Sequence, residues 1–284
     1  MPASPYSSVQ QARERIAARL VEVMKDAGIR TGRELARRLG WQESKVSRIV
    51  NAVTPPSEDD VRAWCAACDV PGEVPGLIAA LQIAEGAYVE WRRLERAGLR
   101  AAQEKVLPVY ERTARFRAYS PSLISGLLQT REYCAAVLRA VQVRRRLSDD
   151  VEEAVQVRME RQRILSDPTK TFSFILEEQV LNSRVADNDV MAAQLQHLLT
   201  ILATHPNVSL RVIPSGSRRQ RWAAEGFWIY GTEQVTVELI GAYLTVTQPS
   251  EIVLYEQAFS ELGALTVTGT GVRSLIAAAA HALG

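Results

Sequence analysis

Side chains suited to hydrogen bonding with DNA gather between residues 31 and 48 of the 284-residue sequence. Amides, hydroxyls and cations can meet the edges of bases in the major groove or the phosphates of the backbone. The candidate DNA-contacting residues are Thr31, Arg33, Arg37, Gln42, Glu43, Ser44, Lys45, Ser47 and Arg48. Because the formal net charge of the whole chain is only +2, binding to nucleic acid would have to come from such a local patch.

Hydrophobic spacing predicts the helices that would hold these side chains. Apolar residues at three-and-four spacing indicate a first helix over about Gln10–Ala27, and a glycine follows to end it. Thr31 and Glu34 have the spacing of a capping box, which predicts that a second helix begins there and ends at Gly40. A third helix is expected over about Glu43–Val50.

Two short helices joined at a glycine have the geometry of a helix-turn-helix, whose second helix enters the major groove. The alternative is an αα-hairpin with a solvated outer face. Two observations favour the helix-turn-helix: the expected core positions suit the packing of the two helices, and the outer faces lack a balancing run of acids. These core positions are Leu35, Ala36, Leu39, Val46 and Ile49.

The run T-G-R-E-L-A-R-R-L-G-W-Q-E-S-K-V-S-R-I resembles the helix-turn-helix of XRE-family (Cro/cI-like) repressors. The resemblance implies sequence-specific binding to double-stranded DNA and a bundle of five helices that ends near residue 85. Its later helices would be Asp59–Asp69 and Val74–Ala84. The sequence departs from the family at Gln42, where a serine or threonine cap is usual, and at Ile49–Ala52, where the family has Ile-Glu-Asn-Gly. We expect the first departure to weaken the cap of the recognition helix.

The sequence offers few residues for metal or redox chemistry. Cys65 and Cys68 form a C-A-A-C pair, but the other cysteine, Cys134, is distant in sequence and the histidines are scattered. A reactive or zinc-binding pair needs an electropositive helix terminus or a second ligand pair, so we expect these cysteines to pack in the core. The odd number of cysteines, and the lack of a signal peptide or a long apolar run, favour a cytoplasmic protein with no membrane contact.

Catalytic motifs are absent from the sequence, which has no G-x-S-x-G, P-loop, H-E-x-x-H or G-x-G-x-x-G. Glu177 and Glu178, at the end of an expected strand, could act as acid and base, but paired carboxylates at such a position are more often solvated. Asp187–Asp189 looks like the start of a calcium loop but lacks the downstream glycine and glutamate, so a helix N-cap is the better interpretation. We therefore expect a protein that is not an enzyme and that needs no metal or cofactor.

A change of pattern after Glu85 predicts two domains, 1–85 and 86–284. An amphipathic helix is expected over about 88–105, and further helices over 130–141, 151–165, 190–203, 249–264 and 271–283. Alternating apolar residues predict strands over 171–176, 208–213, 225–230, 235–240 and 243–247. The expected fold class is therefore α+β: an all-α helix-turn-helix bundle, followed by a larger α+β domain with a mainly antiparallel sheet.

Several motifs of the second domain resemble the C-terminal domain of WhiJ-like regulators from actinobacteria. They are G-L-L-Q-T-R-E-Y (126–133), V-R-M-E-R-Q-R-I-L (157–165), the L-E-E-Q strand exit (176–179) and the Q-L-Q-H-L-L helix (194–199). The sequence departs from the family at Ser125, where proline is usual. The resemblance implies a transcriptional regulator with an antitoxin-like domain, which often acts with a small partner protein encoded nearby.

Basic residues of the second domain indicate where such a partner would bind. Arg144, Arg145 and Arg146 follow the helix that begins after Thr130, and the arginines of the run 158–163 are expected on an exposed helix face. A basic face suits an acidic partner protein, because complementary charge steers association. The alternative is that these arginines only solvate the surface. The candidate partner-binding residues are Arg144, Arg145 and Arg146.

Three functional hypotheses follow from these patterns. The favoured one is a transcriptional regulator, located with the nucleoid in the cytoplasm, that reads a near-palindromic operator as a homodimer and is controlled by a small partner protein. The second places a small-molecule effector among the aromatic residues Trp222, Phe227, Trp228, Tyr230 and Tyr243. The third is an enzyme with an accessory DNA-binding module. The second ranks below the first, because aromatic residues in a sheet more often form its core.

Overall fold

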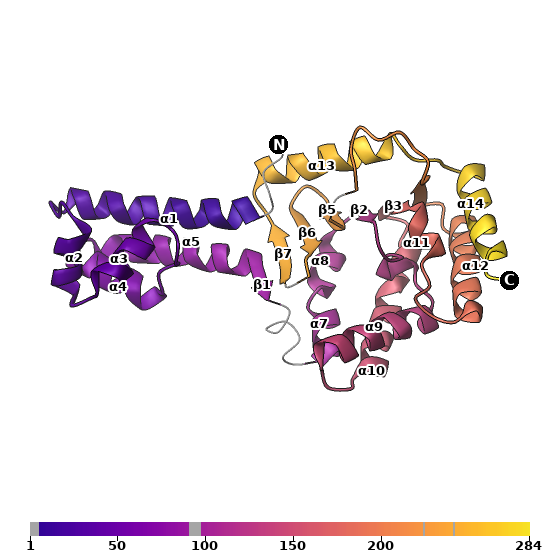
Figure 1. Cartoon of the computed structure of the whole chain (residues 1–284), viewed down its shortest axis with the longest axis horizontal. Helices are drawn as coiled ribbons and strands as arrows, with labels where there is room; N and C mark the ends of the chain where they lie inside the picture. The colour runs from indigo at the N-terminus through magenta and orange to yellow at the C-terminus, as the bar shows by residue number, and fades with distance from the viewer. Residues whose placement is uncertain (1–5, 91–97, 224, 241) are drawn as a thin grey trace. The chain divides into compact units, whose positions relative to one another are not determined.

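The computed structural model describes residues 6–90, 98–223, 225–240 and 242–284. The chain divides into two compact units, Met1–Val89 and Glu90–Gly284, each with its own hydrophobic core (Figure 1). Among the described residues, no helix is both long enough and apolar enough to span a lipid bilayer.

From Tyr6 to Ala87 the regular structure of the first unit is helical. Its helices are α1 (Tyr6–Asp26), α2 (Gly32–Leu39), α3 (Glu43–Val50), α4 (Glu58–Ala67) and α5 (Val74–Ala87), with a short 3-10 turn, η1 (Pro71–Glu73), before α5. The core centres on Trp64, which is fully buried and whose indole N–H donates to the carbonyl of Leu20 at 3.0 Å. This hydrogen bond satisfies the one polar group of the buried indole and ties α4 to α1.

The second unit alternates helices and strands. In chain order its elements are α7 (Gly98–Glu104), α8 (Leu107–Arg112), β2 (Arg115–Ser120), η3 (Gly126–Leu128), α9 (Arg131–Arg145), α10 (Val151–Gln162), η4 (Arg163–Ser166), β3 (Thr171–Glu177), α11 (Glu178–Asn182), α12 (Asn188–Thr204), β4 (Val208–Ile213), β5 (Phe227–Tyr230), β6 (Gln234–Glu238), β7 (Ala242–Val246), α13 (Pro249–Gly263) and α14 (Thr270–His281). A short strand, β1 (Tyr88–Glu90), spans the boundary between the units along the chain.

The strands β2 to β7 form one sheet in the order β7-β6-β5-β2-β3-β4. β2 pairs with β3, and β3 with β4, in parallel, whereas the pairings from β2 through β5 and β6 to β7 are antiparallel. The fold class is α+β as predicted, but the sheet is mixed and not mainly antiparallel. The parallel part arises because α9 and α10 connect β2 to β3, and a crossover of this kind brings the chain back in the same direction.

The central strand β2 was not anticipated from the sequence, because a buried arginine interrupts its apolar pattern. Arg117 is only 8% exposed and donates to Glu256 of α13 at 2.6 Å and to the carbonyl of Gly231 at 2.7 Å. On the opposite face of the strand, Phe116 stacks on Phe172 with ring centroids 4.8 Å apart. Both faces of β2 are therefore buried, one of them through an ion pair.

Helices cover the two faces of the sheet. Figure 1 shows α13 running along one face, where Phe227 contacts Phe259 at 6.5 Å between ring centroids. The other face packs in a large apolar core with side chains of α12 and α14, among them Leu195 and Ile276. The sheet thus separates two layers of side chains, and neighbouring aromatic residues of one strand lie in different layers.

The helix expected over 88–105 is only partly present. Tyr88–Glu90 is a strand, residues 91–97 lie outside the described residues, and the chain is helical from Gly98 to Glu104. Gly98 has a φ of +95°, and a methyl group there would lie 2.2 Å from a carboxylate oxygen of Asp150. That carboxylate accepts from the N–H groups that follow Gly98, at 3.1 and 2.9 Å, so a glycine is required where Asp150 caps α7.

Candidate nucleic-acid interface

Hydrogen bonds fix the start of α2, the first helix of the helix-turn-helix. The Thr31 hydroxyl accepts from the N–H of Glu34 at 3.1 Å, which confirms one half of the predicted capping box. The other half was wrong, because the Glu34 carboxylate accepts from the N–H of Arg30 at 3.3 Å instead. The hydrogen bond from Arg38, at 2.8 Å, and then that of Arg30 hold the pKa of Glu34 below its ordinary value.

The turn between α2 and α3 depends on glycine. Gly40 has a φ of +65°, and its N–H bonds back to carbonyls at the end of α2, as predicted for the residue that stops this helix. Within α2, a methyl group on Gly32 would lie 3.2 Å from a methyl of Val46, so the two helices pack closely there. Gln42 occupies the N-cap position of α3 without a side-chain capping bond, which agrees with the weaker cap expected from the sequence.

Most candidate DNA-contacting side chains lie on the outside of this helix pair. The exposed ones are Thr31, Arg33, Arg37, Gln42, Glu43, Ser44, Ser47 and Arg48. Val46 and Ile49 point the other way and are buried in the core, as the spacing predicted. α3 therefore packs on the core with its apolar face and exposes hydroxyl and guanidinium groups on the other face, which is the arrangement a recognition helix needs.

Lys45 differs from the other candidates because it is held against the unit. Its ammonium lies 2.6 Å from the carboxylate of Asp60 in α4 and 4.1 Å from the ring centroid of Trp41. Burial raises the pKa of Asp60, but hydrogen bonds from Lys45 and Ser57 outweigh this effect and bring the pKa below its ordinary value. In this conformation Lys45 braces α3 against α4, but its side chain stays 40% exposed, so a contact of Lys45 with DNA remains a prediction.

Arg37 and Arg48 are the cations that remain available. Within the described residues, neither guanidinium has a hydrogen bond or an ion pair, and both side chains are exposed. Arg33 is also exposed but pairs with Glu43 across the turn at 2.7 Å. An exposed pair of this kind contributes little to stability, so its charges can be separated at low cost.

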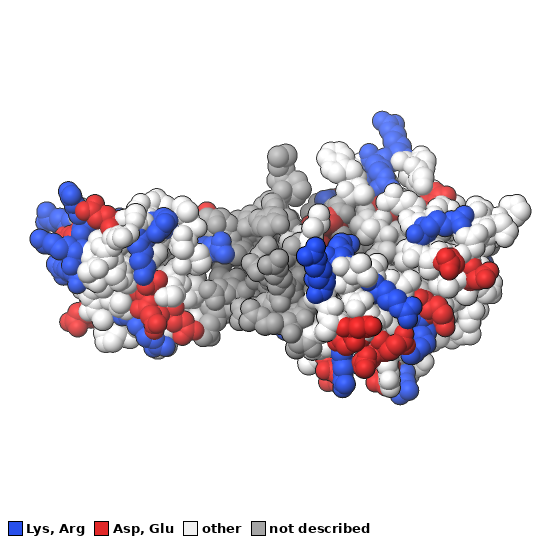
Figure 2. Space-filling model, turned by 60° about the horizontal axis from the view of Figure 1, so that its bottom comes forward, with Lys and Arg blue, Asp and Glu red and all other residues white. Residues whose placement is uncertain are grey.

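Charge is unevenly distributed over the first unit. Figure 2 shows Lys and Arg side chains gathered at the end of the unit where Figure 1 places α2, with a separate group of acidic side chains elsewhere on the same unit. In sequence, the segment from Arg30 to Arg48 carries cations at 30, 33, 37, 38, 45 and 48 against carboxylates at 34 and 43. This is the local positive patch that a nearly neutral chain would need for binding DNA.

The candidate partner-binding arginines lie at the end of α9. Arg144 and Arg146 are exposed, whereas Arg145 is half-buried. Arg146 caps the helix in the left-handed conformation, with a φ of +55°. The expectation that arginines of the run 158–163 extend this surface was wrong for Arg158 and Arg161, because both turn toward α7 and η3 and bind Gln103.

The aromatic residues considered for an effector pocket do not gather in one place. Phe227 lies on the α13 side of the sheet, where it contacts Tyr255 at 5.1 Å between centroids. Trp228 and Tyr230 stack on each other on the opposite face, while Trp222 is 77% exposed on a loop. A single pocket lined by these residues is therefore not formed, because alternate residues of a strand point to opposite faces.

The remaining reactive groups have structural roles. Cys65 and Cys68 are buried in the core of the first unit, as expected, and burial raises the pKa of both thiols. Glu177 was expected to be solvated, but it is buried, accepts from the Tyr119 hydroxyl at 2.7 Å and pairs with both terminal nitrogens of Arg219. Across the described ranges, no group of three or more His, Cys, Asp or Glu side chains could hold a metal ion.

Comparison with known families agrees with this division of the chain. Residues 15–75 match a family described as a helix-turn-helix domain, which agrees with the fold of α2 and α3 and supports a DNA-binding regulator. Residues 104–278 match the domain of unknown function DUF5753. The chain belongs to the DUF5753 family, since this match covers most of its length.

A solved structure with some similarity is that of TrmBL2, described as an archaeal chromatin protein with a novel mode of DNA binding. The two chains share 9% identity, the alignment covers 84% of this chain and 88% of that one, and the TM-score is 0.32. No curated protein matches the sequence.

Proposed function

We propose that the protein is a sequence-specific transcriptional regulator that binds DNA through α2 and α3. The observation that carries the proposal is the exposed face of this helix pair, where Arg37 and Arg48 lack partners in the described part of the chain and Ser44 and Ser47 offer hydroxyls between them in sequence. Arginine can bind guanine bidentately, and hydroxyls can bind bases or phosphates. Such a regulator would act where the genome lies, in the nucleoid.

We further propose that the regulator reads a near-palindromic operator as a homodimer. One module of this size contacts a short half-site, and a small interface gives limited discrimination against other sequences. A dimer can place two recognition helices about 34–36 Å apart, one turn of DNA, and so reads two half-sites together. The second unit, with its large sheet and covering helices, is the part we expect to hold the dimer together.

The DNA-binding proposal is tested by selecting genomic fragments with the purified full-length protein and titrating the enriched site with variants. Arg48→Ala should weaken binding to the enriched site by about 1–3 kcal/mol if Arg48 reads a base. Arg37→Ala should weaken binding to all DNA about equally, and reduce its salt dependence, if Arg37 meets a phosphate. Arg62→Ala is the matched control, since Arg62 is on α4 and pairs with Glu58 at 3.6 Å.

The proposal fails if no sequence is enriched, or if the Arg37 and Arg48 variants bind like the Arg62 control. The hydroxyl variants Ser44→Ala and Ser47→Ala extend the test to the same face of α3. Equal affinity of all variants for the selected site and for unrelated DNA would mean that α3 does not read sequence, even if the protein binds DNA.

We also propose that a small acidic protein controls the regulator by binding at Arg144, Arg145 and Arg146. The support is the exposure of Arg144 and Arg146 at the end of α9, together with the resemblance of the second unit to WhiJ-like antitoxin-like domains. Complementary charge would steer the partner to this end of the helix and select against basic proteins. Because coupling between two sites is reciprocal, the partner would change operator affinity as much as the operator changes partner affinity.

Native mass spectrometry of the protein purified from its own host tests the partner proposal. We expect a co-purifying acidic polypeptide that is lost from the Arg144→Glu/Arg146→Glu variant. The control variant Arg163→Glu/Arg273→Glu makes the same change of charge at other exposed arginines and should retain the partner. If no polypeptide co-purifies, or both variants retain it equally, these arginines only solvate the surface.

A further inference from the structure

Two neighbouring arginines of α10 are half-buried in the second unit, and neither forms an ion pair with a carboxylate among the described residues. Arg158 and Arg161 are one helical turn apart, and both approach the side chain of Gln103 in α7. The Arg158 guanidinium donates to the amide oxygens of Gln103 at 3.1 Å and Gln129 at 2.9 Å. Within the described residues, neither arginine has a carboxylate oxygen within 4.0 Å, so neutral amides are their only close polar partners apart from backbone and thiol groups.

Arg161 is the less satisfied of the two. Its terminal nitrogens reach Gln103 only at 3.4 and 3.5 Å, and its Nε is buried without a hydrogen-bond partner. The guanidinium also lies 4.9 Å from the ring centroid of Tyr110, an interaction that favours the cation but does not neutralise it. Burial lowers the pKa of Arg158 and the nearby Arg161 lowers it further, while Cys134 and the carboxylate of Glu238 act in the opposite direction, which agrees with two positive charges held close together.

Two other arginines of the same unit are compensated by a carboxylate: the buried Arg117 pairs with Glu256, and the half-buried Arg219 pairs with Glu177. By contrast, the half-buried Arg211 donates to the Ser173 hydroxyl at 3.2 Å. Burying a cation without a carboxylate partner costs several kcal/mol in the low dielectric of a protein interior. Two adjacent cations that lack this compensation therefore suggest that an anionic group completes the site.

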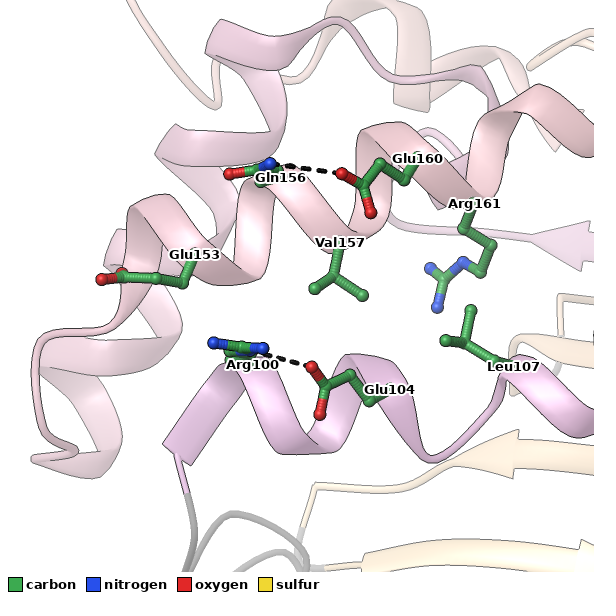
Figure 3. Close-up of a pocket in the computed structure, with 8 residues that line it drawn as sticks. All are labelled: Arg100, Glu104, Leu107, Glu153, Gln156, Val157, Glu160 and Arg161. Carbon is green, nitrogen blue, oxygen red and sulfur yellow. Dashed lines mark hydrogen bonds and ion pairs between the residues drawn. The ribbon is translucent and has the colours of Figure 1, made fainter.

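A pocket of about 480 Å³ between α7 and α10 leads to Arg161. Figure 3 shows the guanidinium of Arg161 pointing into this space beside Leu107, with Val157 at its centre. Carboxylates also line the pocket: Glu104 pairs with Arg100 at 2.8 Å, and Glu160 accepts from the Gln156 amide at 3.2 Å, so Arg161 lies at one end, Val157 in the middle and hydrogen-bonded carboxylates along the sides. Its volume lies within the range of about 300–1,000 Å³ that is usual for small-molecule sites.

The three kinds of lining restrict the ligand. A simple anion would be attracted by Arg161 but repelled by the carboxylates. A simple cation would be attracted by the carboxylates but repelled by Arg161. A molecule with a carboxylate, an ammonium and a small apolar body satisfies all three, because each group then lies against its complement. We propose that this pocket binds a small zwitterion of the amino-acid class, with its carboxylate on Arg161, its ammonium between Glu104 and Glu160, and its apolar side chain on Leu107 and Val157.

Such a site goes beyond control by a partner protein, and its test does not depend on DNA binding. Ligand binding to the full-length protein is measured by isothermal titration calorimetry, with L-leucine, L-methionine and L-phenylalanine as probes. We expect saturable binding of at least one of them. Its carboxylate-free amide and its ammonium-free acid should each bind at least about tenfold more weakly, since each loses a charged hydrogen bond.

Variants then locate the site. Arg161→Met keeps the apolar length of the side chain but removes its charge, and should weaken binding by at least about tenfold. Glu160→Gln should also weaken binding, by loss of the ammonium contact. Arg163→Met is the matched control, because Arg163 lies two positions further along the chain and is exposed, and it should bind like the wild type.

The melting temperature of the ligand-free protein separates a binding role from a structural one. If Arg161 is kept for a ligand, Arg161→Met should leave the melting temperature unchanged or raise it, since a half-buried charge without an ion pair is removed. The proposal is overturned if none of the three amino acids binds saturably, if Arg161→Met binds as tightly as the wild type, or if it lowers the melting temperature markedly without affecting affinity. Equal binding of the amide or of the acid would show that the ligand is not recognised as a zwitterion.

Discussion

The contact between Lys45 and Asp60 gives a prediction that tests how the recognition helix is held. Asp60 has two roles, because its carboxylate meets Lys45 of α3 at 2.6 Å and also accepts from the N–H of Ser57 at 3.1 Å in a complete capping box of α4. Asp60→Asn removes the charge but leaves an amide oxygen that can cap the helix. Asp60→Ala removes both functions, so the difference between the two variants isolates the ion pair from the cap.

The loss of stability expected for each variant follows from the exposure of the Lys45 and Asp60 side chains. The side chain of Asp60 is 15% exposed and that of Lys45 is 40% exposed, so the pair lies between a surface ion pair, worth up to about 1 kcal/mol, and a buried charged hydrogen bond of about 1.5–3 kcal/mol. We expect Asp60→Asn to destabilise the first unit by about 1 kcal/mol. Asp60→Ala should cost about 2 kcal/mol, since loss of the cap adds about 1 kcal/mol.

Differential scanning calorimetry of the full-length protein measures these losses. For a domain of this size, 1 kcal/mol lowers the melting temperature by about 4–8 °C, so the transition of the first unit should shift and that of the second unit should not. A double-mutant cycle with Lys45→Met should give a coupling energy of about 1 kcal/mol. A coupling energy below about 0.3 kcal/mol would refute the bracing role of Lys45 and would favour a cation that is free to bind DNA.

The same pair gives a pH dependence with a definite sign. Because the pKa of folded Asp60 lies below its ordinary value of about 4, the folded protein holds this proton less tightly than the unfolded chain does. The stabilisation is therefore fully present above about pH 4 and is lost as the pH falls through the folded pKa. The stability difference between wild type and Asp60→Asn should shrink as the pH falls below about 4, and a constant difference would contradict the assignment.

Other predictions concern backbone strain, assembly and the buried carboxylate of the second unit. Gly98→Ala should destabilise the second unit by about 2–4 kcal/mol in urea unfolding, from left-handed strain and displacement of Asp150, whereas Gly76→Ala in a helix with open space should stabilise slightly. By sedimentation, the full chain should be a dimer and an isolated 1–85 fragment a monomer; a dimeric fragment would overturn the proposed assembly. Glu177→Gln should lower the free energy of unfolding by about 2 kcal/mol, a figure reduced for the partial exposure of Arg219. An unchanged free energy of unfolding would mean that the pair does not stabilise the fold.

The helix-turn-helix was predictable because its signals are local. Each boundary depends on residues within a few positions, such as the Thr31 hydroxyl at one end of α2 and the left-handed Gly40 at the other. Side-chain partners from other helices were not predictable in the same way. The spacing of α3 places Lys45 on an outer face, but only the packing of α4 brings Asp60 and the ring of Trp41 to it.

In the sheet, too, contacts between residues distant in sequence could not be predicted. Strands with regular alternation were found from their pattern, and β4 was predicted with the bounds it has, 208–213. β2 was missed because the acid that allows Arg117 to be buried belongs to α13, more than a hundred positions later in the chain. Without β2, the parallel pairings could not be inferred, and the sheet was expected to be mainly antiparallel.

Three of the four motifs that carry the family resemblance meet at one place in the structure, the loop around η3. Gln162 donates to the carbonyls of Gly126 and Gln129 at 2.8 Å, and Gln194 donates to the carbonyl of Leu128 at 2.7 Å. Gln129 in turn donates to the carbonyl of Ile124 at 2.7 Å. These glutamines satisfy the backbone of a buried loop, which otherwise would carry unpaired polar groups.

Several of the residues that carry the resemblance therefore stabilise the loop around η3. The arginines of the same motif, Arg158 and Arg161, differ from these glutamines because they carry a charge. A scaffold needs donors at Arg158 and Arg161, and a neutral amide could supply them, as it does at Gln162 in the same helix. Positive charge at Arg158 carries a desolvation cost that its amide partners Gln103 and Gln129 do not offset with an opposite charge. The physical difference between glutamine and arginine at these positions is charge, and charge is what a ligand with a carboxylate would use.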